Sequence, residues 1–184
     1  DIDAYDAYLI TGSVAGVYED FDWIQQLMVV VQEAYAKQKK IFGICFGHQL
    51  ISQAFGGQVV KADSGYRIGV FDTEIVNAPD WLNTDVESRN VVYFHQDRVI
   101  DLPDNATLIA TTPGYDNSMY HIDNQVFCMQ AHPEQSRESL LKFLNHMRDD
   151  ISESLMTDAE SSIQTVDADT LVYAGWIRSF LENA

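Results

Sequence analysis

Two spacings of hydrophobic and polar positions recur along this chain, and each predicts one kind of secondary structure. Apolar residues every three or four positions predict helices with one buried face, at residues 21–37, 47–55, 136–147 and 170–181. Short apolar runs bounded by turn-forming residues predict strands, at 7–11, 41–44, 58–60, 68–75, 91–95, 106–111, 119–122 and 126–130.

The order of these elements predicts the architecture. The first 55 residues give strand, helix, strand and helix, which is typical of a parallel sheet with helices on its faces. We therefore expect an α/β fold with a central, mostly parallel sheet flanked by helices. The 184 residues fit one domain, with its main body at 1–150 and an acidic helical extension of the same domain at 151–184. Residues 149–169 carry seven acidic and no basic residues, so we expect a solvated helix or loop there rather than core.

Charge and composition exclude several classes of partner. The formal net charge is −17, which disfavours binding to nucleic acid and to anionic membrane surfaces. No apolar stretch is long enough to span a bilayer, and the acidic start of the chain is not a secretory signal. Two cysteines without regular spacing suit a reducing compartment, so we predict a cytoplasmic protein. No pair of histidines or cysteines has ligand spacing, and we expect neither a metal nor a cofactor.

One of the two cysteines stands at a cramped position. Cys45 lies between Gly43 and Gly47, where a predicted strand turns into a predicted helix. Such a strand-to-helix turn is a nucleophile elbow, in which the residues two before and two after the apex come close together. The start of the following helix favours a thiolate at the apex. The alternative is a small buried hydrophobe at a tight turn, which is the role we expect for the other cysteine, Cys128.

A thiolate nucleophile in acyl chemistry needs a base, and the base needs a group that orients it. Of five histidines, His132 stands out because it follows a predicted strand and precedes Pro133 and Glu134. Positions two apart in extended chain point to one side, so the Glu134 carboxylate can hold the imidazole in one tautomer. The rigid proline between them stiffens the connection.

Four segments together resemble the class I, triad-type glutamine amidotransferases, in the branch related to the glutaminase domain of GMP synthase. These are Gly43-Ile-Cys-Phe-Gly-His-Gln49, Gln130-Ala-His-Pro-Glu134, Thr11-Gly-Ser-Val-Ala-Gly-Val-Tyr-Glu-Asp20 and Tyr93-Phe-His-Gln-Asp-Arg-Val99. They follow the family's order and span about residues 5–147. The resemblance implies a flavodoxin-like fold.

The resemblance also implies a role for each matching residue. Cys45 would attack the side-chain amide of glutamine, His132 would carry the proton, and Glu134 would orient His132. The backbone N–H groups of Gly12, Ser13 and Phe46 would hold the oxyanion. Four residues would hold the substrate: Gln49, His95, Gln96 and Asp97. Glutamate and ammonia would be the products, with ammonia released or passed to a separate accepting protein.

The chain departs from the family pattern at two places. Gln96 stands where many relatives have glycine, which bears on substrate placement. Only six residues precede Ala7, so the family's first strand and helix are missing from the sequence. We expect the sheet to have an unpaired strand edge there, which favours association, including a homo-oligomer.

Three functions remain open at this point. The first is glutamine hydrolysis through a cysteinyl thioester. The second is a γ-glutamyl peptidase that cuts the amide bond of larger γ-glutamyl compounds with the same three residues. The third is a non-catalytic homologue, against which Cys45, His132 and Glu134 all argue. A cysteine protease of the PfpI-like type has a similar elbow but lacks the His-Pro-Glu arrangement.

Overall fold

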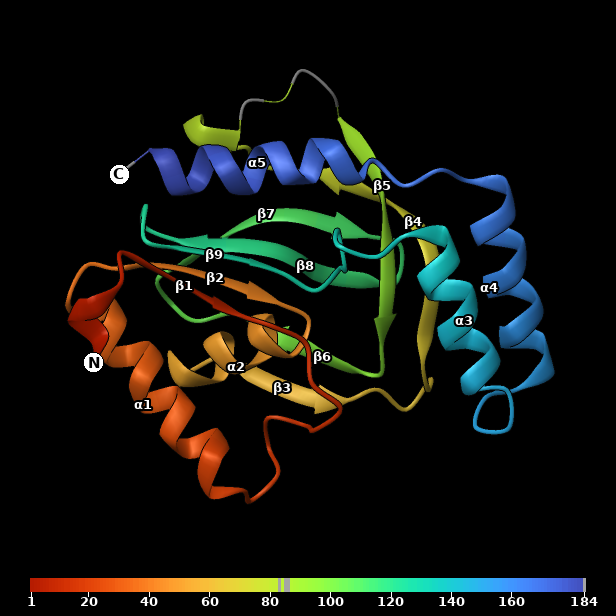
Figure 1. Cartoon of the computed structure of the whole chain (residues 1–184), viewed down its shortest axis with the longest axis horizontal. Coiled ribbons are helices and arrows are strands. Elements are labelled where there is room, and N and C mark those ends of the chain that lie inside the picture. Colours follow the sequence, from red (N-terminus) through yellow and green to blue (C-terminus); the bar gives the residue numbers. More distant parts are fainter. Residues whose placement is uncertain (83, 85–86, 184) are drawn as a thin grey trace.

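The computed structural model describes residues 1–82, 84 and 87–183 and has a seven-stranded sheet at its centre (Figure 1). The strands lie in the order β1-β2-β9-β8-β7-β4-β5. Their bounds are β1 Ala7–Ile10, β2 Lys40–Ile44, β9 Val126–Met129, β8 Tyr115–Ile122, β7 Ala106–Thr112, β4 Arg67–Ile75 and β5 Ser88–His95. A second, two-stranded sheet pairs β3 Gln58–Lys61 with β6 Asp97–Asp101.

The α/β prediction is confirmed, and the sheet is mixed. β1 pairs with β2 and β2 with β9 in parallel, whereas the pairs from β9 through β8, β7 and β4 to β5 are antiparallel. Short connections between β7, β8 and β9 fix that antiparallel half, because a tight turn can join only antiparallel neighbours. The parallel neighbours β1 and β2 need a crossover between them, and the helix predicted before β2 provides it.

Helices cover both faces of the sheet (Figure 1). Their bounds are α1 Asp22–Ala36, α2 Phe46–Ala54, α3 Arg137–His146, α4 Glu153–Thr165 and α5 Thr170–Glu182, with single 3-10 turns at Ile2–Ala4 and Asp80–Leu82. α1 and α2 pack on one face, with Ile24, Ile41 and Leu50 in that core. α5 packs on the opposite face, where Phe180 contacts Trp81 and Phe127. α3 and α4 pack against β4 and β5.

The expectation that residues 149–169 lie outside the core is wrong for α4. Met156, Ala159 and Ile163 of this helix are buried against β4. They recur at helical spacing, so one apolar face packs inward. The acidic charge of residues 149–169 conceals this stripe in the sequence. No strand was predicted at β6, which pairs with β3 from Gln58↔Asp101 to Lys61↔Asp97.

β1 lies at one edge of the large sheet, and within the described residues only β2 pairs with it. Leu9, on this strand, keeps 56 % of its surface exposed. The predicted unpaired edge is therefore present. Within the described residues, no helix combines the length and apolar character needed to cross a membrane. The cytoplasmic location and the homo-oligomer stay predictions.

Candidate active site

Cys45 occupies a strained turn between β2 and α2. Its backbone has φ 52° and ψ −104°, in the half of conformational space that non-glycine residues rarely adopt. A Cβ on Gly43 would lie 2.8 Å from the carbonyl carbon and oxygen of Gly47, closer than atoms can pack. This confirms the close approach predicted for the residues two before and two after the cysteine. The strand-to-helix elbow therefore depends on having glycine at the positions two before and two after Cys45.

A second close approach brings the turn after β1 to the elbow. A Cβ on Gly47 would lie 2.2 Å from the Ile10 carbonyl oxygen, so only glycine lets α2 start against β1. In the turn after β1, a Cβ on Gly12 would lie 3.8 Å from Cys45 Cβ and 3.3 Å from His132 Cε1. The Gly12-Ser13 turn therefore borders both side chains.

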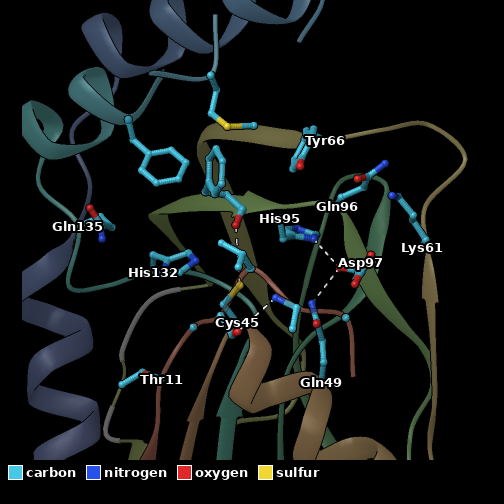
Figure 2. Close-up of a pocket in the computed structure, with 18 of the residues that line it drawn as sticks. Thr11, Cys45, Gln49, Lys61, Tyr66, His95, Gln96, Asp97, His132 and Gln135 are labelled. Carbon is cyan, nitrogen blue, oxygen red and sulfur yellow. Dashed lines mark hydrogen bonds between the residues drawn. The ribbon is translucent and has the colours of Figure 1, made fainter. Parts of the chain in front are cut away.

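His132 follows β9 and faces Cys45 from the neighbouring strand (Figure 2). Its Nδ1 lies 2.6 Å from Glu134 Oε1. Its side chain is only 12 % exposed, and burial acts to lower the pKa of His132. The Cys45 sulfur and the Glu134 carboxylate outweigh burial and raise the pKa of His132 to about 10. The site therefore favours a protonated imidazole beside the sulfur.

The Glu134 carboxylate responds in the opposite direction. Burial opposes its ionisation, but the hydrogen bond from His132 lowers the pKa of Glu134 below its ordinary value. Because Nδ1 donates to Glu134, the other ring nitrogen, Nε2, is the one left to exchange a proton. That Nε2 is buried and has no hydrogen-bond partner among the described residues. It is available for a substrate or for the sulfur.

The expected substrate residues lie beside Cys45. Two of their side chains, those of Gln49 and His95, are hydrogen-bonded to the backbone of a third, Asp97. The Asp97 carbonyl oxygen accepts a hydrogen bond from Gln49 Nε2 at 3.0 Å and one from His95 Nδ1 at 2.8 Å. Gln49 Nε2 also donates to Gln130 Oε1 at 3.0 Å. Within the described residues, the Gln49 side-chain oxygen and Asp97 Oδ2 are consequently the oxygens without a hydrogen bond here. Gln96 lines the same cavity with no hydrogen bond from its side chain to another described residue.

His95 is neutral in this arrangement. Burial first, and nearby positive charges after it, lower the pKa of His95 to about 3. The Nδ1–H of the neutral ring donates to the Asp97 carbonyl oxygen. His95 therefore fixes the turn that carries Asp97 and is unsuited to proton transfer near neutral pH.

The Asp97 carboxylate belongs to a polar cluster that sequence reasoning missed. Tyr18 donates its hydroxyl hydrogen to Asp97 Oδ1 at 3.0 Å, and Glu19 accepts the Gly16 N–H at 2.9 Å. Burial raises the pKa of Asp97, and Lys61 opposes this rise. Tyr18 and Glu19 stand in the segment 11–20 that resembles the family, and this resemblance was the sequence signal that could have marked them. Lys61 stands in no motif, so nothing in the sequence marked it.

These residues line one cavity of about 540 Å³. Its walls include Cys45, His132 and Glu134 together with every predicted site residue except Phe46. Phe46 is the first residue of α2, so its N–H has no partner within the helix. Within the described residues, no group of three or more His, Cys, Asp or Glu side chains is arranged to hold a metal. Cys128 is fully buried in the core, as predicted.

A family model described as "Glutamine amidotransferase class-I" matches residues 1–144. The chain belongs to the class I glutamine amidotransferase family. Among relatives of this family member, "Gamma-glutamyl peptidase 3" of Arabidopsis thaliana is 33% identical over 191 residues, covering 100% of this chain and 77% of the relative. "GMP synthase [glutamine-hydrolyzing]" of Tropheryma whipplei is 32% identical over 128 residues, covering 70% of this chain and 24% of the relative.

Solved structures agree with the family at the level of the fold. The crystal structure of a glutamine amidotransferase from Thermotoga maritima superposes with a TM-score of 0.81 at 20% identity, covering 100% of this chain and 81% of that one. The α/β architecture expected for class I glutamine amidotransferases is therefore present.

Proposed function

We propose that this amidotransferase-family protein hydrolyses γ-glutamyl amide bonds through a thioester on Cys45. The observation that carries the proposal is the placement of His132. It faces Cys45 at a strained elbow, and Glu134 holds it at 2.6 Å. Nucleophile, base and orienting group in this order are the parts that cysteine acyl chemistry requires.

In the first half of the reaction, the Cys45 sulfur attacks the amide carbon of the γ-glutamyl group. The carbonyl oxygen becomes an oxyanion, which the N–H groups of Phe46 and of the Gly12-Ser13 turn stabilise. The C–N bond then breaks, and His132 gives its Nε2 proton to the leaving nitrogen. The products of this half are a free amine and a γ-glutamyl thioester on Cys45.

In the second half, water attacks the thioester carbon. His132, now neutral, accepts a proton from that water, and Glu134 stabilises the imidazolium that forms. The C–S bond breaks, glutamate leaves, and the Cys45–His132 pair is restored. The overall reaction consumes one water and yields glutamate and an amine.

Among γ-glutamyl amides, we favour those larger than glutamine. The relative named gamma-glutamyl peptidase 3 matches this chain from end to end, and the GMP synthase relative matches a smaller share. A cavity of about 540 Å³ falls in the range that holds a drug-sized ligand. Glutamine itself is the second candidate, supported by the family and by the glutamine-hydrolysing relative. In that case the ammonia would go to solution or to a separate accepting protein.

The test is hydrolysis of L-glutamine and of γ-glutamyl alkylamides, with glutamate release followed by mass spectrometry. Addition of hydroxylamine should divert the thioester to γ-glutamyl hydroxamate. Cys45→Ala should abolish both products, whereas Cys128→Ala, which changes the other buried cysteine, should keep them. Hydrolysis that persists in Cys45→Ala would overturn the proposal.

A further inference from the structure

The cavity around Cys45 has two chemically different ends. Hydrogen-bonding and charged side chains gather at one end: Tyr18, Glu19, Gln49, Lys61 and Asp97. Apolar and aromatic side chains make up the other wall: Tyr66, Phe94, Leu140, Phe143 and Met147. Figure 2 shows Cys45 and His132 between Lys61 and Asp97 on one side and Gln135 on the other. A substrate that fills this cavity has to be polar at one end and apolar at the other.

The apolar wall begins at Phe94, whose backbone lies beside the sulfur. The Phe94 carbonyl oxygen lies 3.8 Å from Cys45 Sγ. The Phe94 ring contacts Phe143 of α3 edge-on, with centroids 4.3 Å apart, and Tyr66 with centroids 5.9 Å apart. Phe143 nonetheless keeps 42 % of its surface exposed. An aromatic row left open inside a concave site is a surface that an apolar ligand group can cover.

The direction of proton transfer decides which part of the substrate meets this wall. His132 must reach the leaving nitrogen, so the leaving group lies on the His132 side of the sulfur. In the chain, Glu134 is followed by Gln135 and α3; this helix supplies Leu140 and Phe143 to the cavity, and Met147 directly after it supplies the third apolar side chain. The polar end, with Asp97 and Lys61, suits the α-ammonium and α-carboxylate of the glutamyl group.

Resting on the proposed function, we infer that the preferred substrates are γ-glutamyl amides whose amine carries an apolar or aromatic group. Phe143, Phe94 and Met147 form the subsite for that group. Ammonia, the leaving group of glutamine, would leave the wall uncovered. A leaving group with a ring would remove that apolar surface, and its own, from water.

The experiment compares γ-glutamyl-cyclohexylmethylamide with γ-glutamyl-methylamide. Both leaving groups are primary alkylamines, so they differ in apolar bulk rather than in basicity. We expect kcat/KM for the cyclohexylmethyl compound to be about 10- to 200-fold higher, the range that added methylene groups give in an apolar pocket. Equal values for the two amides would overturn the subsite while leaving the proposed function intact. No hydrolysis of either amide or of glutamine would overturn the proposed function, and the subsite with it.

Substitutions test whether the apolar wall causes the preference for the cyclohexylmethyl compound. Phe143→Ala should reduce the ratio of the two kcat/KM values about tenfold. Leu171→Ala removes an 87 % exposed apolar side chain from α5, on the other face of the sheet, and should leave the ratio unchanged. A ratio that stays the same in Phe143→Ala would remove this side chain from the subsite. The wild-type ratio provides a test that needs no variant to fold.

Discussion

Glu134 Oε1 lies 2.6 Å from His132 Nδ1, and this contact fixes both the tautomer and the direction of the imidazole. The two residues are separated only by Pro133, at the exit of β9. The contact orients the unpartnered Nε2 toward the elbow cysteine (Figure 2). If His132 transfers the proton, its alignment depends on a carboxylate two residues away.

Replacement of Glu134 by glutamine should reduce turnover without stopping it. The amide can still accept the Nδ1–H, but it no longer stabilises the imidazolium by its charge. By analogy with other orienting carboxylates, kcat should fall by about 10²- to 10⁴-fold. Steady-state rates for Glu134→Gln and the wild type provide the measurement. A rate close to that of the wild type would mean that another group orients His132.

Turnover should persist into alkaline solution and then fall. The acid form of His132 donates to the leaving nitrogen, and that form exists below its pKa, which is raised to about 10. We therefore expect kcat/KM, which reports the free enzyme, to fall as the pH rises toward about 10, rather than near the ordinary value of 6.5. In Cys45→Ala one of the two raising groups is lost, so NMR of the His132 ring should give a lower titration midpoint. An unchanged midpoint would mean that the Cys45 sulfur does not raise the pKa of His132.

Gly47→Ala should destabilise the protein because its Cβ would lie 2.2 Å from the Ile10 carbonyl oxygen. The backbone of β1 or of α2 has to move, at a cost of about 1–3 kcal/mol in the free energy of unfolding. Gly175→Ala is the matched control, since nothing lies within 4 Å of its Cβ and it stands inside α5. That change should stabilise the helix by about 0.5–1 kcal/mol. Urea denaturation of both variants measures the free energy of unfolding. An equal change in the two variants would contradict the close packing at the elbow.

Asp97→Asn should weaken substrate binding more than it slows the chemistry. The carboxylate lies among Tyr18, Glu19 and Lys61, away from the reacting atoms in the proposed mechanism. Loss of a charge-assisted bond to the substrate ammonium should raise KM about 10- to 100-fold, with kcat changed much less. Asp101→Asn, at the exposed end of the same strand β6, is the control and should leave both unchanged. A loss confined to kcat would place Asp97 in the chemical step instead.

Local sequence signals predicted the elbow well because they are steric. Gly43 and Gly47 flank Cys45 at fixed distances along the chain, and the close approach follows from the turn itself. The spacing of His132 and Glu134 likewise defines a contact within three residues. Neither depends on the rest of the fold.

Features that depend on distant segments were not predictable in this way. Lys61 and Tyr18 meet Asp97 only because the β3–β6 pairing and the turn after β1 converge on it. The wall formed by Phe94 and Phe143 joins β5 to α3 across the cavity. In α4, total charge concealed a buried stripe that includes Met156 and Ile163. The antiparallel direction of β7, β8 and β9 was also set by the lengths of the turns between them rather than by their apolar runs.

The most direct test of the account is the covalent trapping of Cys45. The glutamine analogue 6-diazo-5-oxo-L-norleucine alkylates a thiolate that has a glutamyl pocket beside it. We predict a single adduct by intact-protein mass spectrometry, mapped to Cys45, present in Cys128→Ala and absent from Cys45→Ala. No adduct on a folded sample, or an adduct mapped to another residue, would contradict a catalytic thiolate at this elbow.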